Sequence, residues 1–349
     1  MGRLCPVRSH HGLLLLAAGL ALFAFYYSGS EKRVEEEEEQ PRGAEAKSAE
    51  EPPQDLHLLV MFTKADKSPA LGAKFRLALA SLLGAGKLEA REVLNLHLVT
   101  DEASKEAAKA ALRDLLRGVA FKCKVIFHDV NALTEKLFPV VEAMQKHFSA
   151  GSGTYYSDSI FFLSVAMHRI MPKEIPRLIQ LDLDLKHKSN IRELFEEFDN
   201  FPIGAVIGIA HEMQPVYRHT FWQYRQENPE SKVGSPPPDG LPGFNSGVLL
   251  LNLEAMRQSK LYNQLLEPRE IQRLTEKYHF RGHLGDQDFF TMIGMEHAEL
   301  FHILDCVWNR QLCTWWRDHG YGKVFDLYYR CEGHVKILHG NCNTPISED

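Results

Sequence analysis

Arg177-Leu-Ile-Gln-Leu-Asp-Leu-Asp-Leu-Lys-His-Lys188 is the stretch that decides the fold expected for this chain. Its apolar run ends in two aspartates, Asp182 and Asp184, which are separated by Leu183. The pattern predicts a buried strand whose carboxyl end delivers acidic groups to a crevice, where open α/β sheets bind ligands. Two carboxylates this close repel each other unless a cation lies between them or one is protonated, and their hard oxygens suit Mg²⁺ or Mn²⁺. The alternative is that both acids are simply solvated at the end of a strand.

Apolar strands and helices alternate on both sides of this stretch, which indicates a parallel, doubly wound α/β sheet. Before it, strands are expected at 56–63, 93–100 and 125–130, and helices at 74–85, 104–116 and 157–170. After it, we expect a helix at 191–198, strands at 204–210 and 244–253, and helices through residue 278. The polar, proline-rich residues 226–243 predict a long loop, either a lid or a surface for a second substrate.

Composition narrows the class of protein. The 349 residues carry a net charge of −6, which argues against a surface for nucleic acid. None of the six cysteines forms a C-x-x-C pair, so a zinc ribbon is not indicated. Four of them lie in the last 44 positions, which suggests disulfides if the compartment is oxidising. Cys123 would then be a buried free thiol.

The first 54 residues predict a membrane anchor followed by a stem. Residues 12–28 are mostly apolar, slightly fewer than the ~20 of a usual span, and favour a signal-anchor that leaves 1–11 in the cytoplasm. A signal peptide cleaved near Ser28-Gly-Ser30 is one alternative. A buried core helix is another, disfavoured because strongly polar residues follow. A short span fits the thin bilayer of the endoplasmic reticulum. The acid-rich residues 29–54 predict a disordered stem ahead of a lumenal domain at 55–349.

Three further motifs accompany the acid pair. Phe244-Asn-Ser-Gly247 opens an apolar strand, Gly285-Asp-Gln-Asp288 precedes apolar residues, and Leu338-His-Gly-Asn341 lies near the C-terminus. In this order and at roughly this spacing, the four motifs resemble those of family 8 glycosyltransferases. The resemblance implies a GT-A fold, a Mn²⁺ ion with Mg²⁺ as the alternative, and transfer from a nucleotide-sugar with retention of configuration.

Within that family, the resemblance is greatest to members that transfer xylose. Residues 180–201 and the ending His339-Gly-Asn-Cys-Asn-Thr-Pro345 carry it. It implies α-1,3 transfer from UDP-xylose to the xylose of a xylosyl-glucose unit on EGF repeats of Notch-type proteins. It also implies a single-pass type II protein of the endoplasmic reticulum membrane, and it allows a homodimer. UDP-glucose or UDP-galactose stays open as the donor, because the sequence does not show whether the pocket admits a C6 hydroxymethyl group.

The resemblance can be carried over residue by residue. Asp182, Asp184 and His339 match the metal ligands, and a neutral imidazole completes a site for Mn²⁺. A satisfied core histidine is the alternative for His339. Gln287 matches the residue closest to the anomeric carbon; an amide cannot be the nucleophile of a double displacement, which implies a front-face route. Asp288 is expected to hold the donor sugar or to orient its loop. The residues matched to the donor site are Met61, Phe62, Thr63, Leu183, Asn245, Ser246, Leu284, Asp286 and Asn341.

Strand packing is the alternative for Met61 and Phe62, and a tight turn is the alternative for the residues after Phe244. On the acceptor side, Trp315 and Trp316 are candidates, because apolar sugar faces stack on aromatic rings. A hydrophobic cluster beside a disulfide is the alternative there. The four late cysteines allow three pairings. The connectivity hypothesised here is Cys306–Cys331 with Cys313–Cys342. It would clamp the segment of the late histidine against the tryptophan loop.

The chain departs from the family pattern in its basic residues. Many members carry a lysine for the β-phosphate shortly after the histidine, but no lysine follows His339, and Asn341 is the expected neutral substitute. Many also carry Lys or Arg on the helix before the acid pair; residues 157–168 contain none, which leaves Ser157 or Asp158. Two rival classes are a Mg²⁺-dependent phosphohydrolase of the haloacid dehalogenase type and a lumenal binding protein with an inactive transferase fold. The intact site residues argue against the second rival, and the mid-chain position of the acid pair argues against the first.

Overall fold

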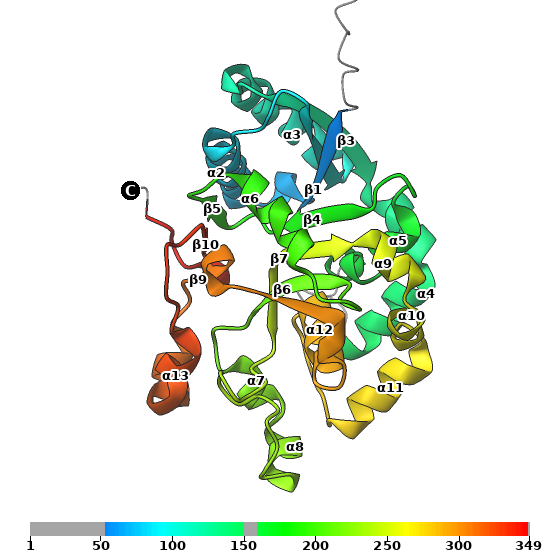
Figure 1. Cartoon of the computed structure of the whole chain (residues 1–349), viewed down its shortest axis with the longest axis vertical. Helices are drawn as coiled ribbons and strands as arrows, with labels where there is room; N and C mark the ends of the chain where they lie inside the picture. The colour runs from blue at the N-terminus through cyan, green and yellow to red at the C-terminus, as the bar shows by residue number, and fades with distance from the viewer. Residues whose placement is uncertain (1–52, 150–158, 348–349) are drawn as a thin grey trace, which may run out of the picture. The chain divides into compact units, whose positions relative to one another are not determined.

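A seven-stranded sheet organises the residues that the computed structural model describes, 53–149 and 159–347 (Figure 1). The strand order is β3-β2-β1-β4-β7-β6-β8. The strands are β1 Gln54–Phe62, β2 Glu92–Thr100, β3 Lys122–Asp129, β4 Arg177–Leu181, β6 Ile207–His211, β7 Phe244–Asn252 and β8 Phe301–Leu304. Neighbouring strands are parallel except that β7 is antiparallel to both β4 and β6. The expected α/β architecture with a mostly parallel sheet is therefore confirmed.

Helices cover both faces of the sheet, because alternate residues of each strand point to opposite sides. Leu58 and Val60 of β1 share a core with the helices of one face, while Leu59 shares a core with those of the other. The first face carries α2 Pro69–Ala85, α3 Glu102–Leu115 and α6 Ile191–Glu196. The second carries α4 Val130–Phe148, α5 Met167–Ile170, α9 Leu253–Gln258, α10 Lys260–Leu265, α11 Pro268–Lys277 and α12 Asp286–Gly294. The remaining helices are α7 Val216–Thr220, α8 Trp222–Glu227 and α13 Gly322–Tyr329.

Side-chain caps at the junctions between strands and helices set where the helices begin. Asp101, directly after β2, accepts a hydrogen bond from the backbone N–H of Ser104 at 2.8 Å. Asp129, the last residue of β3, accepts one from Ala132 at 2.9 Å. Each such cap typically stabilises a helix by about 1 kcal/mol. The chain therefore turns from strand to helix without a long connection.

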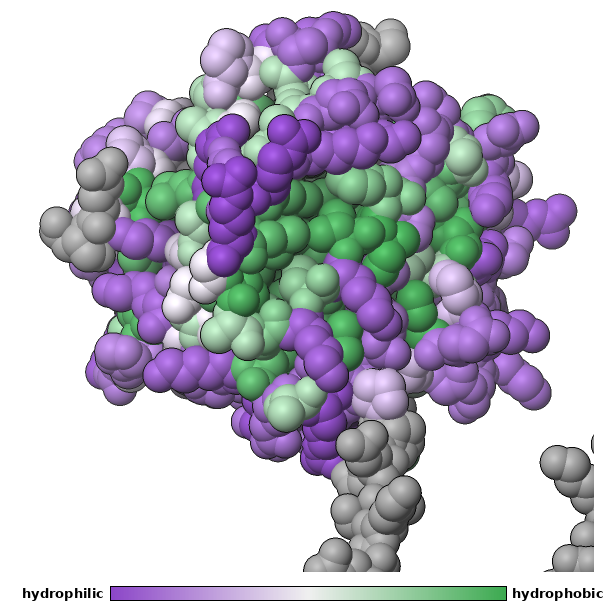
Figure 2. All heavy atoms as spheres, turned by 90° about the horizontal axis from the view of Figure 1, so that it is seen from above, coloured by the Kyte–Doolittle hydropathy of each residue, from purple (hydrophilic) through white to green (hydrophobic). Residues whose placement is uncertain are grey.

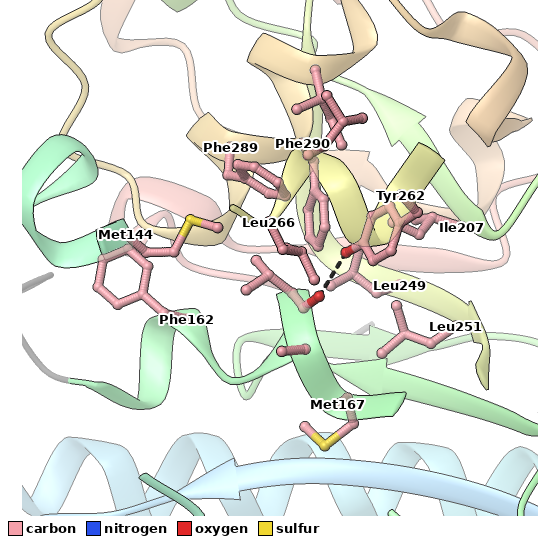
Figure 3. Close-up of a cluster of buried hydrophobic side chains, with 14 of the residues drawn as sticks. Met144, Phe162, Met167, Ile207, Leu249, Leu251, Tyr262, Leu266, Phe289 and Phe290 are labelled. Carbon is pink, nitrogen blue, oxygen red and sulfur yellow. Dashed lines mark hydrogen bonds between the residues drawn. The ribbon is translucent and has the colours of Figure 1, made fainter. Parts of the chain in front are cut away.

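The hydrophobic core on the second face of the sheet fixes α12, the helix that begins with the Asp-Gln-Asp motif. Figure 3 shows Phe289 and Phe290 of α12 among Met144, Leu266 and other buried side chains. Tyr262 belongs to the same cluster, and its hydroxyl donates to the carbonyl oxygen of Val165 at 2.7 Å (Figure 3). Burying one phenylalanine contributes roughly 1.5–3 kcal/mol. The start of α12 is consequently a rigid platform for polar groups.

A second, three-stranded sheet joins the C-terminal segment to the residues after the acid pair. It consists of β5 Leu185–His187, β10 Ile337–His339 and β9 Arg310–Gln311, in the order β5-β10-β9. β10 is antiparallel to β5 and parallel to β9. The sequence pattern did not predict this sheet, because its strands have only two or three residues. It nevertheless determines which late residues reach the acid pair.

Several expected elements need correction. The helix predicted at 157–170 is wrong in most of its described part, 159–170. There, residues 159–162 and 164–166 form 3₁₀ turns, and only α5 is α-helical. The 19-residue helix α4 was not predicted, and Pro139 in its interior is an unfavourable signal for a helix. β1 begins at Gln54, the last residue of the predicted stem. β6 begins at Ile207, because Gly204 forms a turn with φ +95°.

The expected head, anchor and most of the stem lie outside the described residues, as do the glycine-rich segment and the candidates Ser157 and Asp158. Within 53–149 and 159–347, no helix has the length and apolar character needed to cross a bilayer.

Seen from above, at the end of the domain where α3 and β3 lie, hydrophobic side chains form a patch bordered by hydrophilic ones (Figure 2).

Candidate active site

A pocket of about 690 Å³ lies at the carboxyl ends of β1 and β4. The strand order reverses here, because β2 and β3 extend the sheet on one side of β1 while β4 lies on the other. Such a switch point is where open α/β sheets bind ligands. Met61 of β1 and Thr63, which directly follows this strand, line the pocket, as do Asp182 and Asp184 after the end of β4. The crevice predicted from the acid pair is therefore present.

Asp182, Asp184 and His339 meet in this pocket, and their ligand atoms lie within 4.8 Å of one another. His339 Nε2 is 3.3 Å from Asp184 Oδ1 and 3.8 Å from Asp182 Oδ2. The small sheet brings them together, since His339 lies opposite Leu185 in the register of β10 and β5. The N–H of Gly340 also donates to the carbonyl oxygen of Asp184 at 2.8 Å. Two carboxylates and one imidazole form a donor set that suits a divalent cation.

The electrostatics of these three residues also fit a cation. Reduced solvation in the pocket and the like charge of Asp184 raise the pKa of Asp182 to about 7, although half of its side chain is accessible. Burial alone would raise the pKa of Asp184, but the hydrogen bond and charge of His339 outweigh burial and lower it to about 2. Burial opposes a raised pKa for His339, yet the two aspartates prevail and raise it. A positive group between the carboxylates is thus favoured, and an imidazolium takes that role when no metal ion does.

The last residue of Phe244-Asn-Ser-Gly247 is a glycine because the ring of His339 packs against it. A Cβ atom at position 247 would lie 2.4 Å from His339 Cε1 and 2.7 Å from its Nδ1. The carbonyl oxygen of Gly247 also accepts a hydrogen bond from the N–H of Asp182 at 3.0 Å. One residue of β7 thereby contacts both the acid strand and the histidine.

Gln287 and Asp286 are held in fixed orientations at the start of α12. Gln287 Oε1 accepts from the N–H of Ser246 at 3.2 Å, and its Nε2 donates to Glu212 Oε2 at 3.2 Å. Asp286 accepts from Ser164 Oγ at 2.5 Å and from Ser246 Oγ at 2.9 Å. Burial raises the pKa of Asp286 to about 6, although these hydrogen bonds oppose the rise. Both side chains line the pocket.

Asp288 orients its loop, which is one of the two roles expected for it. Its Oδ2 accepts from the N–H of Leu284 at 2.7 Å, and its Oδ1 accepts from the hydroxyl of Tyr217 at 2.9 Å. It is not among the described residues that line the pocket. Contact of Asp288 with a donor sugar is therefore not supported.

Most residues matched to the donor line the pocket: Met61, Thr63, Leu183, Asn245, Ser246, Leu284, Asp286 and Asn341. Phe62 is not among the described residues that line the pocket, and strand packing, the alternative given for it, describes its side chain. Its side chain is 1% exposed and stacks on Phe75 of α2, with ring centroids 4.3 Å apart. Side chains alternate between the faces of a strand, so the ring of Phe62 points away from its neighbour Met61 and into the core.

Basic residues reach the pocket from the segment between β1 and α2 and from the first turns of α2. Lys64, Lys67 and Lys74 all line it. Lys74 Nζ lies 3.7 Å from Asp184 Oδ2 and 2.9 Å from Asn343 Oδ1. The sequence pattern does not single out these lysines. Only the position of these lysines in the sequence could have indicated them, because they follow a strand whose carboxyl end borders the switch point.

Glu212 is a second candidate that sequence reasoning missed. It directly follows β6, is 4% exposed and lines the pocket. Burial raises its pKa to about 7, even though hydrogen bonds from Asn245, Gln214 and Gln287 favour the ionised form. The available signal was an acid at the end of an apolar strand, as in the Asp182 motif.

The structure has the hypothesised disulfides, Cys306–Cys331 and Cys313–Cys342. Asn341 reinforces the second one, because its Oδ1 accepts from the N–H of Leu312 at 3.0 Å and from that of Cys313 at 2.9 Å. The segment after β10 is thereby tied to the loop that leads to the tryptophans, as expected. Cys123 is free, also as expected, but half-buried rather than buried. Desolvation raises the pKa of its thiol to about 11.

The two tryptophans differ in position. Trp316 lines the pocket and lies 5.2 Å, between ring centroids, from both His219 and Tyr321. Trp315 is not among the described lining residues; it is 51% exposed and stacks on His319 at 3.6 Å. Residues 228–243 form the expected loop, whereas 226 and 227 belong to α8. None of residues 226–243 lines the pocket, so a lid is not supported. The loop instead packs against α13, where the Tyr328 hydroxyl donates to the carbonyl oxygen of Gly234 at 2.6 Å.

Comparison with known proteins agrees with this geometry. The model of Glycosyl transferase family 8 matches residues 77–325. Xyloside xylosyltransferase 1 of Mus musculus is 69% identical over 379 aligned positions, which cover 100% of this chain and 97% of that protein. The protein of the same name from Homo sapiens is 68% identical with the same coverage.

Solved structures show the same similarity. The apo crystal structure of mouse xyloside xylosyltransferase 1 has a TM-score of 0.81 at 77% identity, covering 84% of this chain and 100% of its own. The apo structure of the bifunctional WbbM has a TM-score of 0.56 at 12% identity, covering 82% of this chain and 46% of its own, which is a likeness of fold alone. The fold is therefore of the GT-A type.

Proposed function

The chain belongs to glycosyl transferase family 8, and from that premise we propose that it transfers xylose from UDP-xylose to the xylose of a xylosyl-glucose unit. The linkage formed is α-1,3, with retention of configuration. The observation that carries the proposal is the meeting of Asp182, Asp184 and His339 with Gln287 in one pocket. A second support is that the relatives matched over the full length of this chain are named xyloside xylosyltransferase 1.

The acid pair and His339 would hold a divalent ion, and Mn²⁺ is the ion proposed, with Mg²⁺ as the alternative. When bound, this ion supplies positive charge that stabilises a departing diphosphate. Lys74, which also lines the pocket, adds a positive charge beside Asp184. The chain thus gathers positive charge where a nucleoside diphosphate carries its negative charge.

Gln287 determines the route of transfer. Its amide cannot form a glycosyl ester as a carboxylate nucleophile does, so a front-face route follows. The bond between the anomeric carbon and the diphosphate oxygen breaks, and the acceptor hydroxyl oxygen bonds to that carbon from the same face. The hydroxyl proton passes to the leaving diphosphate. The amide oxygen of Gln287 and the carboxylate of Asp286 stabilise the positive charge that develops on the sugar.

The acceptor is proposed to bind at the rim formed by Trp316, on EGF repeats of Notch-type proteins. An indole in the pocket wall offers an apolar face for a sugar ring. A type II protein of the endoplasmic reticulum membrane, anchored by residues 12–28, is proposed for the whole chain. The two disulfides support an oxidising compartment for the domain.

The test is a transfer assay with the full-length chain in detergent. Mn²⁺, an α-xylosyl-glucoside acceptor and each of UDP-xylose, UDP-glucose and UDP-galactose are supplied, beside an Asp184→Ala control. Metal-dependent transfer of xylose with an α-linked product, abolished in the control, is the expected result. Turnover of UDP-glucose or UDP-galactose alone would overturn the xylosyl assignment. Cleavage of a simple phosphate ester with no sugar transfer would overturn the transferase assignment.

A further inference from the structure

Glu212 is a buried carboxylate that three N–H donors surround. Its Oε1 accepts from the N–H of Gln214 at 3.0 Å. Its Oε2 accepts from Asn245 Nδ2 at 3.0 Å and from Gln287 Nε2 at 3.2 Å. These three hydrogen bonds favour the ionised form of Glu212, and an ionised carboxylate can only accept hydrogen bonds. The side-chain amides of Asn245 and Gln287 must therefore turn their NH₂ groups toward Glu212 and their oxygens away from it.

One branch of this network leads from Glu212 to the histidine of the candidate metal site. Asn245 Oδ1 accepts from Asn309 Nδ2 at 2.9 Å and from the N–H of Gly247 at 3.2 Å. Asn309 is fully buried, and its remaining Oδ1 lies 2.9 Å from His339 Nδ1. An amide oxygen can only accept, so the proton between Asn309 and His339 belongs to the histidine Nδ1.

The state of His339 follows from that proton. With Nδ1 carrying hydrogen, the lone pair available to a metal ion is on Nε2. Nε2 is also the nitrogen that faces the two aspartates, at 3.3 Å from Asp184 and 3.8 Å from Asp182. A ligating histidine generally donates its other N–H to a fixed acceptor, which sets the tautomer and ring orientation. Asn309 is that acceptor here.

The other branch leads to Gln287. Because its Nε2 is held by Glu212, its Oε1 faces the N–H of Ser246 at 3.2 Å. The amide cannot rotate by half a turn without placing its NH₂ against the Ser246 N–H and its oxygen against the Glu212 carboxylate. The orientation of Gln287 is thereby fixed from both sides.

We propose that Glu212 is a positioning residue that acts at both ends of the site. Through Asn245 and Asn309 it holds His339 in the Nδ1–H state that leaves Nε2 for a divalent cation, and directly it holds the amide of Gln287. The proposal rests on the proposed function, since it assigns a purpose to the metal site and to Gln287. The backbone N–H groups of Ser246 and Gly247 favour the same orientations, so loss of Glu212 weakens the site without abolishing it.

The first test is Glu212→Gln. The new amide must place its NH₂ either against the Gln214 N–H or against the NH₂ groups of Asn245 and Gln287, so one contact becomes repulsive. Binding of Mn²⁺ to the full-length chain, without donor, is measured by the electron paramagnetic resonance signal of free Mn²⁺. We expect the Kd to rise about tenfold or more, the usual effect of losing an outer-shell partner, and kcat for xylose transfer to fall. The matched control is Glu92→Gln, a buried carboxylate bound to Arg192 and absent from the described pocket lining, which should leave the Kd unchanged.

A double-mutant cycle separates the network from simple charge. Asn309→Asp keeps an acceptor for His339 Nδ1 but removes the donor to Asn245, so it cuts the branch between Glu212 and the histidine. Glu212→Gln should then raise the Mn²⁺ Kd in the wild-type background and change it by less than twofold in the Asn309→Asp background. An equal effect in both backgrounds would mean that Glu212 acts by its charge alone, and the proposal would be overturned.

Three further outcomes complete the test. An Mn²⁺ Kd within twofold of the wild-type value in Glu212→Gln would also overturn the proposal. If Glu212→Gln does not fold, Asn309→Leu tests the same branch with Glu212 intact, and the same rise in Kd is expected. Absence of Mn²⁺ binding and of xylose transfer in the wild-type chain would instead refute the proposed function.

Discussion

Replacing Gly247 by alanine tests whether the geometry of the histidine determines metal binding. The added Cβ would lie 2.4 Å from His339 Cε1, whereas ordinary carbon contacts begin near 3.4 Å. The ring must therefore retreat by about 1 Å. Both ring nitrogens of His339 move with it, because they belong to one rigid ring. The contact of Nδ1 with Asn309 therefore changes together with the 3.3 Å distance between Nε2 and Asp184.

The expected loss follows from that displacement. Ligand distances in metal sites are held within about 0.2 Å, so a 1 Å shift is several times the tolerance. We expect the Mn²⁺ Kd to rise roughly 10–100-fold and transfer activity to fall in parallel. Crowding a buried ring should also lower the free energy of unfolding by about 1–3 kcal/mol.

The assay is titration with Mn²⁺ at pH 7.5, followed by the signal of the free ion, on protein shown by circular dichroism to be folded. Gly84→Ala is the matched control, because no heavy atom lies within 4 Å of a Cβ at this position in α2. Alanine in a helix should stabilise the control by about 0.5–1 kcal/mol and leave Mn²⁺ binding unchanged. A folded Gly247→Ala protein that binds Mn²⁺ as tightly as the wild type would refute the reasoning.

Three further predictions concern other parts of the domain. Acid should destabilise the domain, because burial lowers the pKa values of the hydrogen-bonded His57, His97 and His128 below 6.5. The stability is complete above about pH 6.5 and is lost as pH falls, and His97 alone should account for a loss of about 2 kcal/mol at pH 5. Urea denaturation at pH 7.5 and pH 5 measures this difference in the free energy of unfolding. Cys313→Ser should free the segment after β10, lower the melting temperature and weaken Mn²⁺ binding, whereas opening the other disulfide should lower only the melting temperature. Lys74→Met should weaken UDP about fivefold by calorimetry, for a loss near 1 kcal/mol at a partly exposed site, and leave uridine affinity unchanged.

The sequence was sufficient where the signal is local. The apolar run before Asp182 predicts β4 and its carboxyl end, because a strand needs only a few apolar residues and an acid cannot continue into the core. The alternation that places Met61 in the pocket and Phe62 in the core was also present in the sequence. A contiguous donor segment at 61–63 does not fit the two-residue period of a strand.

The residues that sequence reasoning missed owe their role to tertiary neighbours. Glu212 is one acid among many until β7 and α12 bring the donors Asn245 and Gln287 beside it, in addition to its near neighbour Gln214. No spacing along the chain predicts this, because Asn245 and Gln287 come from two distant segments. Asn309 likewise becomes significant only when both β7 and β10 lie beside it. Buried hydrogen-bond partners of a ligand cannot be recognised before the fold is known.

The missing family lysine can be understood from the same structure. After His339 the chain turns at once into the short segment Asn341–Asn343, in which a disulfide fixes Cys342 to Cys313. Lys74 reaches the same end of the pocket from α2 and meets the segment at Asn343, with 2.9 Å between Nζ and Oδ1. An amide oxygen there orients a lysine whose ammonium also lies near Asp184. The C-terminal segment thus serves as a rigid support, and the positive charge comes from the opposite end of the domain sequence.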